Sequence, residues 1–211
     1  MSRTIDGTTA GAAAIPPTYQ VFTSGSGTYT PPAGVSYLIV EMCGGGGGGG
    51  KNSSTYAAGG GSGAGYIKAK FPVGTYSYSV GAGGAGQGTA GSPGGNGGNT
   101  TFSTLMAEKG YGGPTFSNSE PAVGGGSNPT GAILVLAAVQ GGYGSVGSNL
   151  TCSPGGGSFW APPTYASSGS LLTTSPSSYG YGGGGSGVTS NNFSGAAGNG
   201  SSGRIIVTEY Y

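Results

Sequence analysis

The chain has 211 residues, of which 53 are glycine and only 5% are charged, and its formal net charge is +1. Disordered chains usually combine low hydrophobicity with high net charge, whereas tyrosines and β-branched residues recur throughout this chain, so we expect order without a conventional core. Nucleic-acid binding is not expected, because the few Lys and Arg residues are scattered and form no basic cluster.

The N-terminal residues 1–18 are small and polar and end in two prolines. Such a segment is either a flexible tail or an arm that orders when it docks on a larger assembly. It lacks the apolar core of a signal peptide, and the longest apolar run, Ala132 to Val139, is too short to span a bilayer. We therefore expect a protein made in the cytoplasm, without the usual export and without membrane insertion.

The first strong strand signal is Val35 to Cys43, a run rich in β-branched and aromatic residues that ends at seven consecutive glycines. Tyr19 to Phe22 and Gly27 to Thr30 are shorter strand candidates on either side of a Ser-Gly-Ser-Gly turn, and they predict a hairpin that leads into the long strand. Both faces of that strand are largely apolar, which favours a central strand covered on both sides, or covered on one side by another subunit. Its two faces are Leu38, Val40 and Met42 against Val35, Tyr37, Ile39 and Glu41.

Further strand candidates follow the glycine run. Gly65 to Phe71 and Thr75 to Val80 alternate apolar and polar residues around a Pro-Val-Gly turn, which predicts a second hairpin. Thr100 to Leu105 predicts a short strand, and Ile205 to Tyr211 predicts a strand that closes the chain. Ala132 to Val139 is expected to be a buried strand, because the run is short and carries Val and Ile between glycine clusters.

The remaining glycine-rich sequence has a partial period. Gly88, Gly91, Gly94 and Gly97 recur at every third residue, the period of an extended left-handed helix in which backbones approach closely. The sequence thus predicts an all-β protein, a β-sandwich-like framework of short strands that carries glycine-rich, polyglycine-II-like segments and loops. The expected division is an N-terminal arm at 1–18, a framework at 19–110 with 204–211, and a glycine-rich display region at 111–203.

Catalytic and cofactor motifs are weak. The glycine run before Lys51 resembles a phosphate-binding loop, but Asn52 stands where Ser or Thr should bind magnesium, and no helix-forming sequence follows. The chain has no histidine, and no two of its five carboxylates lie close enough in sequence to suggest a catalytic pair. We expect no enzyme, no cofactor and no metal. Cys43 and Cys152 do not make a disulfide framework, and we expect both to be free.

Aromatic side chains within the glycine-rich tract are the best candidates for a binding role. Aromatic residues on glycine- and serine-rich loops offer rigid, amphipathic contact area in adaptable surroundings. The sequence Phe-Trp-Ala-Pro-Pro-Thr-Tyr concentrates aromatics and prolines in an expected exposed turn. Each of these side chains could instead fill a gap between backbone segments. The predicted contact residues are Phe159, Trp160, Tyr165, Tyr179 and Tyr181.

Four stretches of the framework form one ordered pattern: VFTSGSGTYTPPAGVSYLIVEMCGGGGGGG, AGGGSGAGYIKAKFPVGTYSYSVGAGGAG, GGNGGNTTFSTLMAEKGYGG and GRIIVTEYY. Together they resemble the glycine-rich domain of bacteriophage tail-fibre, tip-adhesin and related virion proteins. The resemblance covers roughly residues 19–113 and 204–211, whereas 116–203 matches only in composition. It implies a β framework with glycine-rich segments, placed on a virion and often used to contact the host surface. Some phage adhesins of similar composition stack such segments as polyglycine-II helices with receptor-contacting loops at one end.

The resulting expectation is a structural virion protein, a phage tail-fibre or adhesin component that binds a host surface glycan or outer-membrane protein through its aromatic-bearing loops. The N-terminal arm would attach it to other virion proteins, and a homo-oligomer, with a trimer favoured, is expected. One alternative is a capsid-attached head fibre or decoration protein. Another is an ice-binding glycine-rich protein, although no regular Thr-x-Thr ladder is present.

Overall fold

The computed structural model describes residues 15–52, 58–115, 132–136, 152–164, 180–189 and 195–211. All regular structure in these residues is β-strand, which confirms the predicted all-β class. The strands are β1 (Thr18–Phe22), β2 (Ser26–Tyr29), β3 (Tyr37–Cys43), β4 (Lys51–Asn52), β5 (Tyr66–Pro72), β6 (Tyr76–Ser79), β7 (Thr100–Phe102), β8 (Leu105–Ala107), β9 (Ala132–Leu136), β10 (Cys152–Ser153), β11 (Gly187–Thr189) and β12 (Arg204–Tyr210).

Nine of these strands form a framework of two antiparallel layers. One layer is a five-stranded sheet in the order β1-β12-β3-β5-β9, and the other is a four-stranded sheet in the order β2-β6-β7-β8. Apolar side chains from both layers meet in one buried core, which makes the framework a β-sandwich. The core includes Leu38, Val40, Met42, Ile67, Ile205 and Val207 from the first sheet and Tyr29, Phe102, Leu105 and Ala107 from the second.

Strand β3 lies at the centre of the five-stranded sheet, as its sequence predicts. Leu38, Val40 and Met42 are at most 1% exposed and face the core, so the predicted inner face is confirmed. Tyr37 and Ile39, on the other face, are only half-buried. The second apolar face of the strand is therefore left partly accessible by the described residues.

Both predicted hairpins are wrong, because the chain crosses between the two sheets at each turn. β1 pairs with β12 whereas β2 pairs with β6. Likewise, β5 pairs with β3 and β9, whereas β6 pairs with β2 and β7. The crossing buries aromatic rings between the layers: the ring of Phe22 lies 4.2 Å from that of Tyr78. A short turn in the sequence does not reveal whether the next strand pairs beside the first or packs opposite it.

Two further strands differ from expectation. The segment predicted as one strand from Thr100 is a tight hairpin of β7 and β8, and Ser103 at its turn has a φ of 54°. Strand β9 exists, but its expected burial is wrong: among the described strands it pairs with β5 alone, at the edge of the sheet. Ile133 is 61% exposed and Leu134 is 40% exposed. The end of the predicted strand, 137–139, lies outside the described residues.

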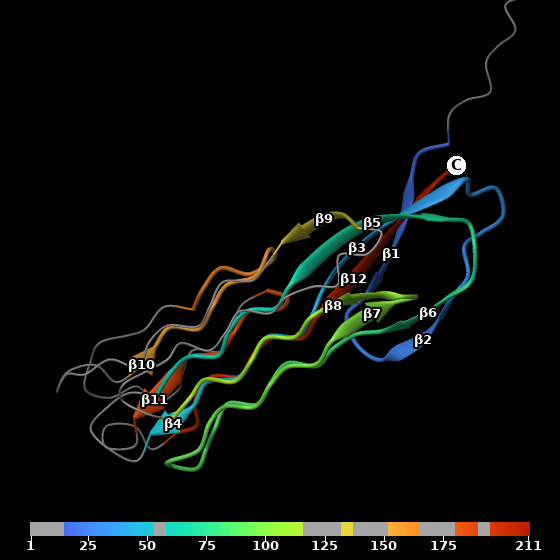
Figure 1. Cartoon of the computed structure of the whole chain (residues 1–211). Coiled ribbons are helices and arrows are strands. Elements are labelled where there is room, and N and C mark those ends of the chain that lie inside the picture. The colour runs from blue at the N-terminus through green and yellow to red at the C-terminus, as the bar shows by residue number, and fades with distance from the viewer. Residues whose placement is uncertain (1–14, 53–57, 116–131, 137–151, 165–179, 190–194) are drawn as a thin grey trace, which may run out of the picture.

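Beyond the framework, glycine-rich segments run side by side in one bundle (Figure 1). Its far end, opposite the framework, carries the small sheet β10-β11-β4. The bundle is centred on residues 44–50, which continue directly from β3. Their amides donate to three neighbours in rotation: Gly45 bonds to Gly98, Gly46 to Ser201 and Gly47 to Ser62, and the next three residues repeat the cycle. This three-residue repeat is that of the polyglycine-II helix.

Six segments surround the central one, and each bonds to it. Three run antiparallel to it and accept its amides, and three run parallel to it and donate to its carbonyls. The ring also closes on itself, because each outer segment bonds to both of its neighbours in the ring. In order around the ring the segments are 81–87, 92–98, 108–114, 58–65, 182–188 and 195–203. Glycine-rich segments from both sides of residue 111 thus enter one bundle, and the division of the chain predicted there stays a prediction.

The central glycines have no room for a side chain. A Cβ added at Gly45, Gly46 or Gly47 would lie 2.0 Å from a backbone carbonyl oxygen of a neighbouring segment. Outer segments require glycine where they face the centre of the bundle or the next outer segment: a Cβ at Gly83 or Gly86 would lie 2.1 or 2.0 Å from a carbonyl oxygen of 195–203. In 81–87, for example, Gly81 and Gly84 are buried, whereas Ala82 points outward and is exposed. The glycine content of the chain therefore follows from the packing of the bundle.

The packing predicts that Gly47→Ala destabilises the protein strongly, by about 3 kcal/mol or more, because the neighbouring backbone of Tyr111 cannot move without breaking bonds on its other side. Chemical denaturation followed by circular dichroism measures the loss. Gly88→Ala is the matched control, since a Cβ there meets nothing within 4 Å. Equal stability of the two variants would contradict the bundle.

Candidate functional site

A cluster of aromatic side chains lies where the five-stranded sheet becomes the bundle. Register pairs Cys43 at the end of β3 with Tyr66 of β5 on one side and with Arg204 of β12 on the other, so the three side chains share the outer face of the sheet. Two rings from a later turn cover this face. Phe159 stacks on Tyr66 with ring centroids 4.1 Å apart, and Trp160 meets Tyr66 edge-on at 5.2 Å.

The turn that carries these rings is held by hydrogen bonds. The amide of Ser158 donates to the carbonyl of Ala161 at 2.8 Å, and the Ser158 hydroxyl donates to the carbonyl of Tyr181 at 2.5 Å. Trp160 also pairs with Tyr181 in an isolated β-bridge. The segment before the turn, 154–157, packs on the outside of the bundle, where Gly156 bonds to the ring segments on either side. The turn is thus fixed to the bundle at several points.

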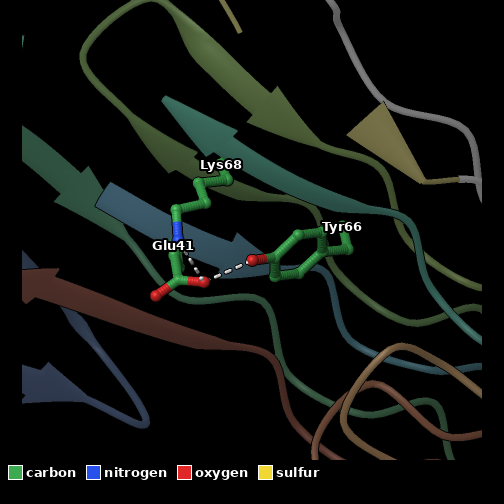
Figure 2. A network of polar contacts seen from close by, with 3 residues as sticks. All are labelled: Glu41, Tyr66 and Lys68. Carbon is green, nitrogen blue, oxygen red and sulfur yellow. Dashed lines mark hydrogen bonds and ion pairs between the residues drawn. The ribbon is translucent and has the colours of Figure 1, made fainter. Parts of the chain in front are cut away.

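Tyr66 lies beneath the cluster, and the rings of Phe159 and Trp160 pack on it. It is 1% exposed, and its hydroxyl donates to Glu41 Oε1 at 2.5 Å. Figure 2 shows Lys68 reaching the same oxygen, with its Nζ at 3.5 Å. Burial, together with the hydrogen bond to the Glu41 carboxylate, raises the pKa of Tyr66 well above its usual range. The phenol therefore remains a neutral donor, and its bond to Glu41 fixes the orientation of the ring.

Arg204 lies against two rings of the cluster. The central carbon of its guanidinium is 4.8 Å from the Tyr181 ring centroid and 5.5 Å from that of Trp160, within the range of cation–π attraction. Phe159 is 53% exposed, whereas Trp160 and Tyr181 are half-buried. The cluster combines one accessible ring with a cation that lies against two partly covered rings.

The structure brings together three of the five contact residues predicted from sequence, namely Phe159, Trp160 and Tyr181. Tyr165 and Tyr179 lie outside the described residues. Sequence reasoning missed Tyr66 and Arg204. The alternation of β12 places Arg204 opposite its core-facing residues, but no local signal shows that distant strands carry the arginine and the tyrosine to the same place.

Lys51, which follows the glycine run, has a structural role at the far end of the bundle. It is 5% exposed, and its Nζ donates to the carbonyls of Gly195 at 2.8 Å and Gly88 at 3.3 Å. Its amide continues the central repeat by donating to Ser92. The ammonium thus ties two outer segments to the central one, where a phosphate-binding loop would leave it facing a ligand.

In the described ranges, no group of three or more His, Cys, Asp or Glu residues could hold a metal ion. No helix in the same ranges has the length and apolar character needed to cross a membrane.

The sequence profile of the glycine-rich domain family matches residues 22–210, which include the framework from β2 onward, the bundle and the aromatic cluster. The chain belongs to the glycine-rich domain family. No curated protein matches it closely enough to count as a relative. Residues 1–21, with the N-terminal arm and nearly all of β1, lie outside the family match.

Cys43 lies beneath the cluster as a free, fully buried thiol, so it does not pair with Cys152. Burial raises the pKa of the Cys43 thiol to about 12, and the nearby Arg204 offsets this only in part.

We predict that Cys43 in a Cys152→Ser variant resists a thiol reagent at pH 8 in the native state and reacts rapidly in denaturant, because attack requires the thiolate. The native state keeps the thiol proton that the unfolded chain loses above about pH 9, so stability should fall as the pH rises from there toward 12. The absorbance of the chromophore that the reagent releases measures the reaction. Rapid native modification would mean that the cluster leaves Cys43 open.

Proposed function

We propose that the protein is a structural virion component, a phage tail-fibre or adhesin subunit that attaches particles to the host surface. The proposal extends the glycine-rich family membership by the more specific resemblance of the framework stretches to virion proteins. On this proposal the protein acts on the virion and has no catalytic role. Its host ligand is a cell-surface glycan or an outer-membrane protein.

The observation that carries the proposal is the bundle of segments packed six around one. Every residue from Gly45 to Gly50 both donates to and accepts from a neighbouring segment, so the bundle is a stiff body and not a linker. Binding residues commonly sit on loops positioned by a rigid scaffold. Here the turn with Phe159 lies on such a scaffold, to which Ser158 and Gly156 bond it.

The outer face of the five-stranded sheet supports association between copies. Tyr37 and Tyr210 stack there with parallel rings 4.7 Å apart, and Lys70 lies 4.0 Å from the Tyr37 ring centroid. Beside them on β1, Tyr19 is 70% exposed and Val21 is 41% exposed. Contiguous apolar surface of this kind marks interaction sites. A homo-oligomer, with a trimer favoured, would cover it, and the N-terminal arm would bind other virion proteins.

Location on the particle can be tested directly. A nanobody raised against the purified protein and coupled to gold should label the tail tips of particles from the source lysate in electron micrographs. A nanobody against an unrelated protein is the control. Label spread over capsids would favour the head-fibre or decoration alternative, and unlabelled particles would contradict a virion role.

Attachment can be tested with matched variants. Purified protein should compete with particles for host cells, and Phe159→Ala should weaken this competition about tenfold or more, because an exposed ring next to a rigid cluster is a typical binding hot spot. Val73→Ala is the control, since Val73 is 48% exposed in a turn at the other end of β5. Equal competition by the two variants, at equal thermal stability, would exclude Phe159 from the contact.

A further inference from the structure

Arg204 is a cation that forms no ion pair with the described residues. The ion pair found in the described part of the chain joins Lys68 to Glu41, and Arg204 takes no part in it. Its Nε atom is buried and has no hydrogen-bond partner. A buried donor without an acceptor normally costs free energy, so an unpaired guanidinium nitrogen calls for an explanation.

The neighbouring rings determine how the guanidinium can be used. Tyr181 and Trp160 contact the guanidinium within cation–π range, at 4.8 and 5.5 Å from its central carbon. A guanidinium directs its N–H groups outward in its own plane, where a planar oxyanion can accept two parallel hydrogen bonds. The rings also remove much of the water that would otherwise screen the charge.

The local charge balance favours an anion. The Glu41 carboxylate lies on the same sheet face, but Lys68 and the Tyr66 hydroxyl already hold it. The set Glu41, Lys68 and Arg204 therefore carries one net positive charge. Next to it, the 53% exposed ring of Phe159 offers an apolar surface that suits the ring of a sugar.

We propose that Arg204 binds the carboxylate of an acidic sugar whose ring packs on Phe159, so that the protein prefers surface polysaccharides that contain such sugars. This inference rests on the proposed attachment function and names the ligand class for the same cluster. Because Nε is buried, the Nη groups of Arg204 supply the charge-assisted hydrogen bonds to the carboxylate, while Trp160 and Tyr181 lie within cation–π range of the guanidinium.

The test uses a reporter that the chain already has. Trp160 is the only tryptophan and lies beside Arg204, so its fluorescence reports occupancy of the site. The full chain is titrated with glucuronate and galacturonate, and with glucose and galactose as neutral counterparts. We expect at least one acid sugar to change the fluorescence with an affinity about tenfold or more above that of its neutral counterpart, and added salt to weaken the response.

Three variants separate a specific site from general attraction. Arg204→Gln should abolish the preference for the acid sugar, and Arg204→Lys should lose most of it while keeping the charge, because an ammonium cannot form the paired bonds. Lys70→Gln removes a positive charge from the same sheet face but should keep the preference for the acid sugar. Thermal unfolding of each variant checks that the fold is intact.

Two results would overturn the inference: equal responses to acid and neutral sugars, including none to either, or an equal loss of preference in Lys70→Gln and Arg204→Gln. A failure of the attachment function is seen separately. If the protein competes for host cells through Phe159 but shows no preference for acid sugars, only this inference is contradicted. If it prefers acid sugars but does not compete for host cells, the attachment function is contradicted.

Discussion

The structure depends on the hydrogen bonds that residues 44–50 make to six neighbouring segments, and on the absence of side chains that lets those neighbours approach. Fixing a glycine in regular structure costs about 0.5–1 kcal/mol relative to alanine. A net gain of about 0.5–1.5 kcal/mol per hydrogen bond is of the same size. The bundle is therefore stable only if nearly every glycine uses both its amide and its carbonyl, as Gly45 to Gly50 do. This requirement excludes isolated glycine segments and demands a closed ring.

The strands of the β-sandwich position the segments of the bundle. β3, β6 and β8 lead outward into 44–50, 81–87 and 108–114, and β5, β7 and β12 receive segments that return. Strand pairing and the apolar core thus fix the starting position and direction of most of the bundle. At the far end Lys51 serves the same purpose with a buried charge, since it bonds to two outer segments at once. The bundle itself has almost no side chains. It is held at one end by the apolar core of the sandwich and at the other by the hydrogen bonds of Lys51.

The features of the fold and of the cluster that can be predicted from the sequence are those set by neighbouring residues along the chain. The strand Val35 to Cys43, its core face and the framework class are local patterns, and the structure has them. The period at Gly94 and Gly97 is also real, since both face the central segment, whereas Gly91 has a φ of 78° and leaves the bundle. Both hairpins failed because pairing partners are non-local. Arg204 and Tyr66 were missed for the same reason: each meets Cys43 only through sheet register.

The position of the cluster at the junction of sheet and bundle has a consequence for binding. A ring on a mobile loop loses conformational freedom when a ligand orders it, and that loss reduces affinity. Phe159 instead stacks on Tyr66, which Glu41 already orients, and its turn is bonded to the bundle through Ser158. The same bonds that make the bundle stiff thus preorganise the exposed ring and the guanidinium beside it. For the proposed attachment function this geometry matters, because avidity multiplies small affinities only if each site keeps its geometry.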